Sequence, residues 1–173
     1  MTDGSTNAAG VTPVILFRSA EEFHAAASQL HPGFFEPQAR DLLKIMPAYF
    51  LYGHAIELAL KSYLFKKGHN FKNLRNYGHD LQKLCQVSGH ELHMLMGQQY
   101  GGMIGIICHQ YTNMKWHSEF RYVQSLEPRE LPALSAVHIF SSALLGAIGP
   151  VCRDEPADWA SLDAGSDEDV IQP

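Results

Sequence analysis

The stretch from Gln38 to Lys67 constrains the fold of this 173-residue chain more than any other segment. It contains no glycine except Gly53, and Leu, Ala, Tyr, Phe and Lys dominate it, a composition typical of one long helix. Pro47 indicates a kink or a restart within that helix. Gly68, which follows two lysines, is the expected C-cap because glycine readily adopts the left-handed conformation that ends a helix.

Helical patterns also cover most of the remaining chain. A capping box of Ser19 and Glu22 predicts a helix over Ala20–Leu30, and further helices are expected at His79–Val87, after a second capping box of Ser88 and Glu91, at Met103–Asn113 and at Leu131–Gly149. Polar, turn-forming residues predict loops at His69–Gly78 and Met114–Arg129, whereas the glycines from Gly97 to Gly105 fit either a break or a close helix contact. No run of alternating β-branched residues competes with these helices. The predicted fold class is therefore all-α, an antiparallel four-helix bundle with additional short helices.

The amino-acid composition predicts one globular domain with unstructured ends. The chain is 46% hydrophobic and 18% charged, which allows a sizeable core without a metal or disulfide staple. We expect a flexible N-terminus at residues 1–18, the helical bundle at residues 19–152 and an acidic, disordered tail at residues 153–173.

Cysteine usage and the N-terminal sequence predict a cytoplasmic protein. Cys85, Cys108 and Cys152 are odd in number and far apart, which fits reduced core thiols better than disulfides. The polar N-terminus lacks the pattern of a secretory signal. Serines and prolines interrupt the apolar run from Leu131 to Cys152, so we interpret it as a buried core helix and expect no membrane association.

The long helix is apolar around its whole circumference, apart from one polar stripe. His54, Glu57 and Lys61 fall within an arc of about 60° when residues are placed at helical intervals. The stripe fits a partly solvated edge, in which Glu57 and Lys61 form an ordinary i,i+4 pair. It also fits a polar cluster inside the bundle or at a dimer seam, which we expect to include Asp80. A helix that is apolar on all sides needs cover from its own bundle or from a second subunit, so a homodimer is expected.

Basic side chains gather between residues 61 and 83. Six of them against one acid, Asp80, give this segment a net charge of +5, and aromatic residues lie between them. The six are Lys61, Lys66, Lys67, Lys72, Arg75 and Lys83. Mobile cations suit phosphates and aromatic faces suit unpaired bases, so this surface is a candidate for RNA or nucleotide binding. A solvated helix end that binds the acidic tail fits the same residues.

Two other patterns have simpler interpretations. His79 and Asp80 stand at a helix start, where one of them can cap the helix. Spacings of metal ligands occur once each, at Glu21-x-x-His24, His54-x-x-Glu57 and His90-x-x-His93, as expected by chance in a chain with ten histidines. We therefore expect no metal site and no other cofactor.

Three phrases of the sequence, taken in order, resemble one family. They are YFLYGHAIELALKSYLFKKG at Tyr49–Gly68, YGHDLQKL at Tyr77–Leu84 and NMKWHSEFRY at Asn113–Tyr122. Together they resemble the HEPN domain family, and the resemblance covers the chain from Ala39 to Pro150. It implies an antiparallel four-helix bundle that often dimerises and binds nucleotides or RNA. Many members are metal-independent ribonucleases of toxin–antitoxin and phage-defence systems, and others are non-catalytic partners, for instance of minimal nucleotidyltransferases.

The family's catalytic pattern is an Arg, an adjacent polar residue and a His after four to six intervening residues, and this chain departs from it. Arg121 has no such His downstream, and Arg75 precedes His79 by only three intervening residues. The one formal match, Arg18 and His24 with five residues between them, lies outside the resembling region and is expected by chance. If RNA is cleaved, we expect metal-free attack of the 2′-hydroxyl on the adjacent phosphate, with His79 and Arg121 as the catalytic residues. Lys61, Arg75 and Tyr122 would support them.

The sequence thus predicts an RNA- or nucleotide-binding protein of a defence or toxin–antitoxin system. Its expected partners are RNA or a nucleotide, a second copy of the chain, and a nucleotidyltransferase-type protein. The predicted binding residues are Lys61, Lys66, Lys67, Lys72, Arg75 and Tyr122. The alternative is a non-catalytic dimeric interaction module, in which Glu57, Lys61 and His79 have purely structural roles.

Overall fold

The computed structural model describes residues 10–30, 42–119 and 131–154, and these residues fold into seven helices without a strand. The helices are α1 (Pro13–Leu30), α2 (Leu42–Lys66), α3 (Phe71–Tyr77), α4 (Leu81–Met96), α5 (Gln98–Asn113), α6 (Trp116–Glu119) and α7 (Leu134–Cys152). The predicted all-α fold is therefore confirmed for the described part of the chain.

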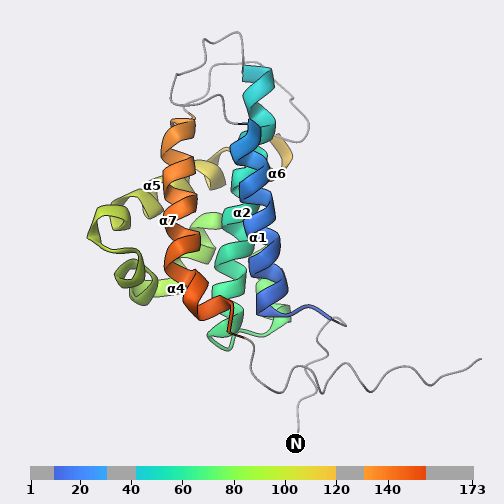
Figure 1. Ribbon diagram of the computed structural model, residues 1–173, viewed down its shortest axis with the longest axis vertical. Coiled ribbons are helices and arrows are strands. Elements are labelled where there is room, and N and C mark those ends of the chain that lie inside the picture. The colour runs from blue at the N-terminus through green and yellow to red at the C-terminus, as the bar shows by residue number, and fades with distance from the viewer. Residues whose placement is uncertain (1–9, 31–41, 120–130, 155–173) are drawn as a thin grey trace, which may run out of the picture.

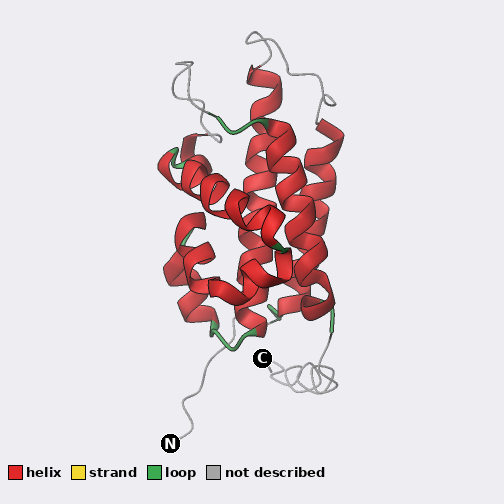
Figure 2. Ribbon diagram, turned by 90° about the vertical axis from the view of Figure 1, so that its left-hand side faces the viewer, coloured by secondary structure: helices red, strands yellow, loops and turns green. Residues whose placement is uncertain are grey.

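Three long helices, α1, α2 and α7, lie side by side along the long axis of the molecule (Figure 1). In that view the chain ascends through α1 and descends through both α2 and α7. α4 and α5 pack against each other on one side of these helices, and Figure 2, which brings that side forward, shows helices crossing obliquely. α2 is the central helix of the bundle, because it contacts α1, α3, α4, α6 and α7.

The chain itself covers α2 on nearly every side. Tyr52, Ala55 and Leu64 are each at most 1% exposed, and helical spacing places Ala55 and Leu64 on opposite sides of the helix. The predicted long helix is thus confirmed, and it continues through Pro47, whose side chain is exposed. Because the bundle provides this cover, the apolar circumference of α2 requires no second subunit.

α7 and the cysteines also contribute to the core. α7 is long and apolar enough to cross a membrane by length and composition alone. In the bundle, however, its side chains Val137 and Phe140 are completely buried, as expected of a core helix. Cys85, Cys108 and Cys152 are free and buried, which confirms the interpretation as core thiols.

The predicted start of the first helix is wrong. α1 begins at Pro13 rather than after Ser19. The Thr12 hydroxyl accepts a hydrogen bond from the backbone N–H of Ile15 at 3.2 Å, and proline suits the first helical position because its missing N–H would be unpaired there. Residues 13–18, which we assigned to a flexible N-terminus, therefore belong to the bundle.

The predicted capping box at Ser88 is also wrong. The Ser88 hydroxyl donates to the carbonyl of Leu84 in the preceding turn at 2.8 Å, so it does not cap a new helix. The break lies one residue later, at Gly89, where a φ of 70° interrupts α4. Gly97, with a φ of 78°, separates α4 from α5, and the glycines that follow it lie within α5.

The segment between α2 and α4 contains a helix where a loop was predicted. α3 begins after Asn70, whose side chain accepts a hydrogen bond from the backbone N–H of Asn73 at 2.9 Å. Leu74 is 2% exposed and anchors the helix to the core. Asn70, which indicated a turn, is thus the N-cap of a helix, because asparagine is favoured both in turns and at helix N-caps.

Candidate functional site

A buried glutamate on α2, Glu57, forms the centre of the candidate site. It is 2% exposed. Its Oε1 accepts a hydrogen bond from Lys61 Nζ at 2.6 Å, and its Oε2 accepts one from His79 Nδ1 at 2.9 Å. His54 Nδ1 lies 3.8 Å from the same Oε2. The polar stripe therefore belongs to a cluster inside this chain, and we call His54, Glu57, Lys61 and His79 the Glu57 cluster.

The surroundings of Glu57 keep its carboxyl group ionised. Burial raises its pKa, because a charge is poorly solvated inside a protein. The nearby His54 imidazole, the charge of Lys61 and the hydrogen bonds from His79 and Lys61 outweigh burial and lower the pKa to about 2. Glu57 is therefore a carboxylate throughout the physiological pH range.

His79 connects the Glu57 cluster to the surface. A carboxylate can only accept hydrogen bonds, so the Nδ1 that contacts Glu57 carries a proton. In the neutral imidazole, Nε2 on the other edge of the ring is then the acceptor. The side chain is 46% exposed, and its ring stacks on that of His117 with 4.6 Å between the centroids. Glu57 thus fixes one edge of His79, while no side chain of the described residues hydrogen-bonds to the other edge, which can receive a ligand.

Trp116 holds α6 against α2 beside His79. Its indole Nε1 donates to the carbonyl oxygen of His79 at 3.1 Å, and the side chain is 1% exposed. The ring approaches α2 at Gly53, where a Cβ atom would lie 2.7 Å from Trp116 Cε3 and 2.7 Å from Tyr111 Cε1. The single glycine in the long helix therefore makes room for these two rings.

An open pocket with a volume of about 230 Å³ lies next to the Glu57 cluster. It is lined by Tyr77, His79, Asp80, Thr112, Lys115, Trp116 and His117. These residues come from the junction of α3 and α4, from the end of α5 and from the start of α6. Tertiary structure thus joins two segments that both belong to the phrases on which the HEPN resemblance rests.

Sequence reasoning identified only part of this pocket. His79 and Asp80 were candidates, whereas Lys115, Trp116 and His117 were interpreted as loop residues. The tryptophan in this polar segment was the signal that could have found them, because tryptophan buries a large apolar surface and its N–H needs a hydrogen-bond partner when buried.

Asp80 takes the predicted role of a helix cap and, among the residues that the structure describes, lies outside the hydrogen bonds of the Glu57 cluster. Its Oδ1 accepts hydrogen bonds from the backbone N–H of Lys83 at 2.9 Å and from Thr112 Oγ1 at 3.2 Å. Asp80 therefore caps α4, as one of the two residues at this helix start was expected to do. We expected Asp80 in the polar cluster with His54, Glu57 and Lys61. Within the described residues it makes no hydrogen bond to the Glu57 cluster, and it lines the pocket instead.

The basic residues predicted to bind anions are only partly available. Lys61 belongs to the Glu57 cluster, Lys67 pairs with a glutamate on α4, and Lys66 donates to a backbone carbonyl. Lys72 and Arg75 are exposed on α3, the helix that leads into the pocket. These two charges, Lys115 and the exposed Lys83, whose Nζ lies 5.5 Å from the ring centroid of Tyr77, can attract an anion toward the pocket.

Arg121 and Tyr122 lie outside the described residues, so the structure does not place the predicted catalytic partner of His79. Within the described ranges, no group of three or more His, Cys, Asp or Glu side chains could hold a metal ion. No protein-family model, no curated protein and no solved structure matches this chain. Fold and site thus define an all-α bundle in which a buried carboxylate orients a histidine at the edge of a small pocket.

Proposed function

We propose that this chain is a HEPN-like cytoplasmic helical bundle that binds single-stranded RNA or nucleotides at the pocket beside the Glu57 cluster. The observation that carries the proposal is the make-up of the pocket wall, which combines the exposed cation Lys115 with the rings of Tyr77, His79 and His117. A phosphate is attracted by a cation, and an unpaired base stacks on aromatic faces. One small pocket therefore offers partners to both ends of a nucleotide.

The size of the pocket supports a small ligand. Pockets for drug-sized molecules usually span about 300–1,000 Å³. A volume of about 230 Å³ is smaller than that range and suits one nucleotide unit, either free or as part of a strand that continues over the surface. The exposed Lys72 and Arg75 of α3 would contact the phosphates of such a strand.

The helices support a HEPN-like arrangement. We assign α1, α2, α7 and the pair formed by α4 and α5 to the four positions of the bundle, with α1 antiparallel to α2. Within this assignment, the glutamate and lysine of the long helix and the Gly78-His79-Asp80-Leu81 helix start lie together at the Glu57 cluster. Both belong to the phrases on which the resemblance rests.

The Glu57 cluster also bears on the chemistry open to this site. With Nδ1 held by Glu57, His79 Nε2 would take the proton of a 2′-hydroxyl as that oxygen attacks the adjacent phosphate. The bond from phosphorus to the 5′-oxygen would break, and the protonated His79 would pass its proton to that leaving oxygen. The developing negative charge on the phosphate would need a nearby cation, such as Lys115 or Arg121. Because the Arg-to-His spacing of the ribonucleases is absent from the region that resembles the family, we propose binding as the function and expect cleavage to be weak.

Reversing the charge of Lys115 tests the binding proposal. We expect wild-type protein to bind a labelled single-stranded oligoribonucleotide with an affinity that falls steeply as salt is raised, because phosphate contacts release counterions. Lys115→Glu should weaken this binding about tenfold or more. Adding Lys72→Glu and Arg75→Glu to that variant should weaken the binding further. Fluorescence anisotropy at two salt concentrations measures both effects.

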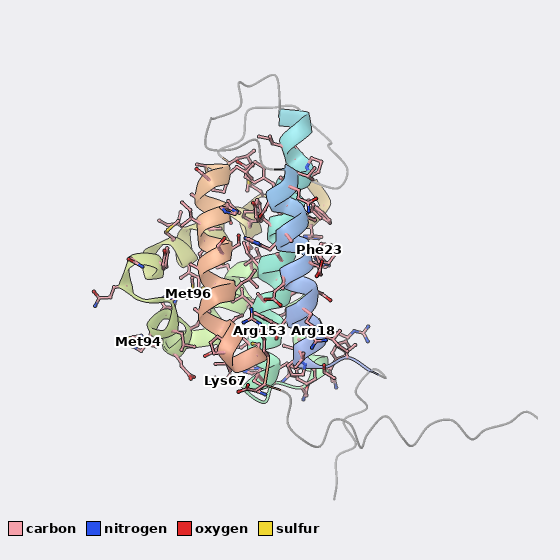
Figure 3. All side chains as sticks on the ribbon, viewed as in Figure 1. Arg18, Phe23, Lys67, Met94, Met96 and Arg153 are labelled. Carbon is pink, nitrogen blue, oxygen red and sulfur yellow. The ribbon has the colours of Figure 1, made fainter. Side chains whose placement is uncertain are left out.

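The matched control is Arg18→Glu, which reverses an exposed charge on α1, a helix that contributes no residue to the pocket (Figure 3). It should leave the affinity within about twofold of wild type, since charges beyond a Debye length are screened. Equal losses in Lys115→Glu and Arg18→Glu would show that binding follows net charge alone, which contradicts the proposed site.

A second candidate function, a dimeric interaction module, is favoured by exposed apolar side chains on α4 and α5. Val87, Met94, Leu95 and Ile106 are 37–67% exposed, and Figure 3 shows Met94 on the outer side of this helix pair. α4 and α5 pack against each other, and a continuous apolar patch across two such helices would be typical of a surface that binds protein. A second copy of the chain or a nucleotidyltransferase-type protein would be the partner.

Sedimentation velocity tests this second function. If α4 and α5 form a homodimer interface, wild type should sediment as a dimer at micromolar concentration, and Met94→Lys with Ile106→Lys should sediment as a monomer. Ile139→Lys changes an apolar side chain that is 41% exposed on α7, so it should not affect the dimer. A wild-type monomer at micromolar concentration would remove the homodimer.

A further inference from the structure

Asp80 caps α4 with one carboxylate oxygen, and its second oxygen makes no hydrogen bond within the described residues. Both hydrogen bonds that described residues make to its carboxylate, from Lys83 N–H and from Thr112, end on Oδ1. The other oxygen, Oδ2, makes no hydrogen bond within the described part of the chain, and Asp80 lines the pocket. An ionised carboxylate offers only acceptor sites, so Oδ2 can receive a hydrogen bond from a ligand.

Capping α4 does not by itself require a carboxylate at position 80. Asn and Ser cap helices about as well as Asp, because one side-chain oxygen is enough to accept the backbone N–H. The negative charge also stands in the wall of a pocket that we propose for an anionic ligand. A carboxylate in such a wall repels a phosphate, so its presence favours a ligand that carries a hydrogen-bond donor as well as an anion.

Lys115 and Asp80 make the pocket dipolar. Lys115 is exposed and Asp80 is half-buried, and both line the same volume of about 230 Å³. A nucleotide has the complementary polarity when its base carries an amino group, with the phosphate at one end and the donor at the other. Uracil instead presents carbonyl oxygens at its edge, on both sides of one ring N–H, and these repel a carboxylate.

We infer, on the basis of the proposed function, that Asp80 selects the base: its Oδ2 accepts a hydrogen bond from the exocyclic amino group of a nucleobase, while Lys115 contacts the phosphate. Carboxylates accept from cytosine N4 in just this way. The site therefore prefers amino-bearing bases, and among the pyrimidines it prefers cytosine to uracil. Asp80 acts as a specificity residue and takes no part in any bond cleavage.

The test compares CMP and UMP, which share ribose and phosphate and differ in the base alone. Isothermal titration calorimetry of wild type should give CMP roughly tenfold tighter binding than UMP, the size expected for one hydrogen bond to a charged group. Asp80→Asn keeps an oxygen for the cap and replaces the other oxygen by an amide donor. It should lose the preference for CMP or reverse it, because the amide donates to the uracil carbonyl.

Two further variants complete the experiment. Asp80→Ser retains a capping oxygen and removes the second one, so it should bind both nucleotides equally and serves if Asp80→Asn fails to fold. Asp154→Asn removes an exposed carboxylate that does not line the pocket, so it should retain the wild-type preference. Thermal melting confirms that each variant is folded.

The outcomes separate this inference from the function on which it rests. If wild type binds neither nucleotide, the proposed function fails and the inference fails with it. If wild type binds CMP and UMP equally, or if Asp80→Asn keeps the preference for CMP, nucleotide binding stands and the role of Asp80 is overturned.

Discussion

Replacing Glu57 by glutamine is expected to lower the free energy of unfolding at pH 7 by about 3 kcal/mol. The pKa of Glu57 falls from 4.5 to about 2 on folding, and each unit is equivalent to about 1.4 kcal/mol of preference for the ionised form. Glutamine retains an oxygen for His79 but leaves Lys61, whose side chain is 15% exposed, without its carboxylate. Removing one partner of a buried pair leaves the other charge uncompensated.

The same pKa shift sets the pH dependence of this loss. A carboxyl group whose pKa is lower in the folded state stabilises the fold fully above its unfolded pKa, here 4.5. That stabilisation is lost as the pH falls toward about 2. Urea unfolding of wild type should therefore show stability falling between pH 5 and pH 2.5, and Glu57→Gln should show a flatter dependence over the same interval.

Glu91→Gln is the matched control, because Glu91 pairs with Lys67 on the surface and both side chains are exposed. Exposed ion pairs contribute little to stability, so this variant should unfold almost like wild type at every pH. Equal behaviour of Glu57→Gln and Glu91→Gln would mean that the Glu57 cluster is solvated rather than buried.

Replacing Gly53 by alanine is expected to destabilise the protein by about 1–3 kcal/mol, as overpacked cores do. The added methyl group would lie 2.7 Å from ring atoms of both Trp116 and Tyr111, closer than carbon atoms can approach. Trp116 has to move, and its hydrogen bond to the carbonyl of His79 moves with it. The pocket should therefore lose its shape, and RNA affinity should fall together with stability.

Gly146→Ala separates this effect from the general effect of alanine in a helix. Gly146 is exposed on α7 with no atom within 4 Å of its added Cβ, so alanine there should be neutral or stabilise by up to about 1 kcal/mol. Thermal melting gives the stability, and near-UV circular dichroism reports on the packing of Trp116. A Gly53→Ala protein with wild-type stability and spectrum would show that Trp116 does not pack against α2.

Helical spacing and capping patterns were enough to predict the contacts that residues make with their near neighbours in the sequence. Glu57 and Lys61 lie one turn apart on a helix, so their pairing follows from spacing alone. Asp80 caps α4 because it stands just before an apolar helical segment. Where two roles share one residue type, as with Asn70 at the start of α3, the sequence could not distinguish a turn from a cap.

The pocket depends instead on contacts that no local pattern encodes. Trp116 and His79 are 37 positions apart, and Asp80 and Thr112 are 32 positions apart, yet both pairs are hydrogen-bonded. Gly53 was unremarkable as a single glycine in a helix, because its purpose is visible only with the rings of Trp116 and Tyr111 in place. Burial of Glu57 is likewise a tertiary property, since the same helical stripe fits a solvated edge.

The most direct test of the proposed function is an NMR titration of ¹⁵N-labelled protein with CMP. The indole N–H of Trp116 donates to the carbonyl of His79 in the pocket wall, so its resonance reports on the pocket itself. We expect this resonance and the backbone amides of His79 and Lys115 to shift with one common, saturable dissociation constant, while the amides of α7, which does not line the pocket, stay unchanged. Saturable shifts confined to other parts of the bundle, or no shifts at millimolar CMP, would contradict nucleotide binding at this pocket.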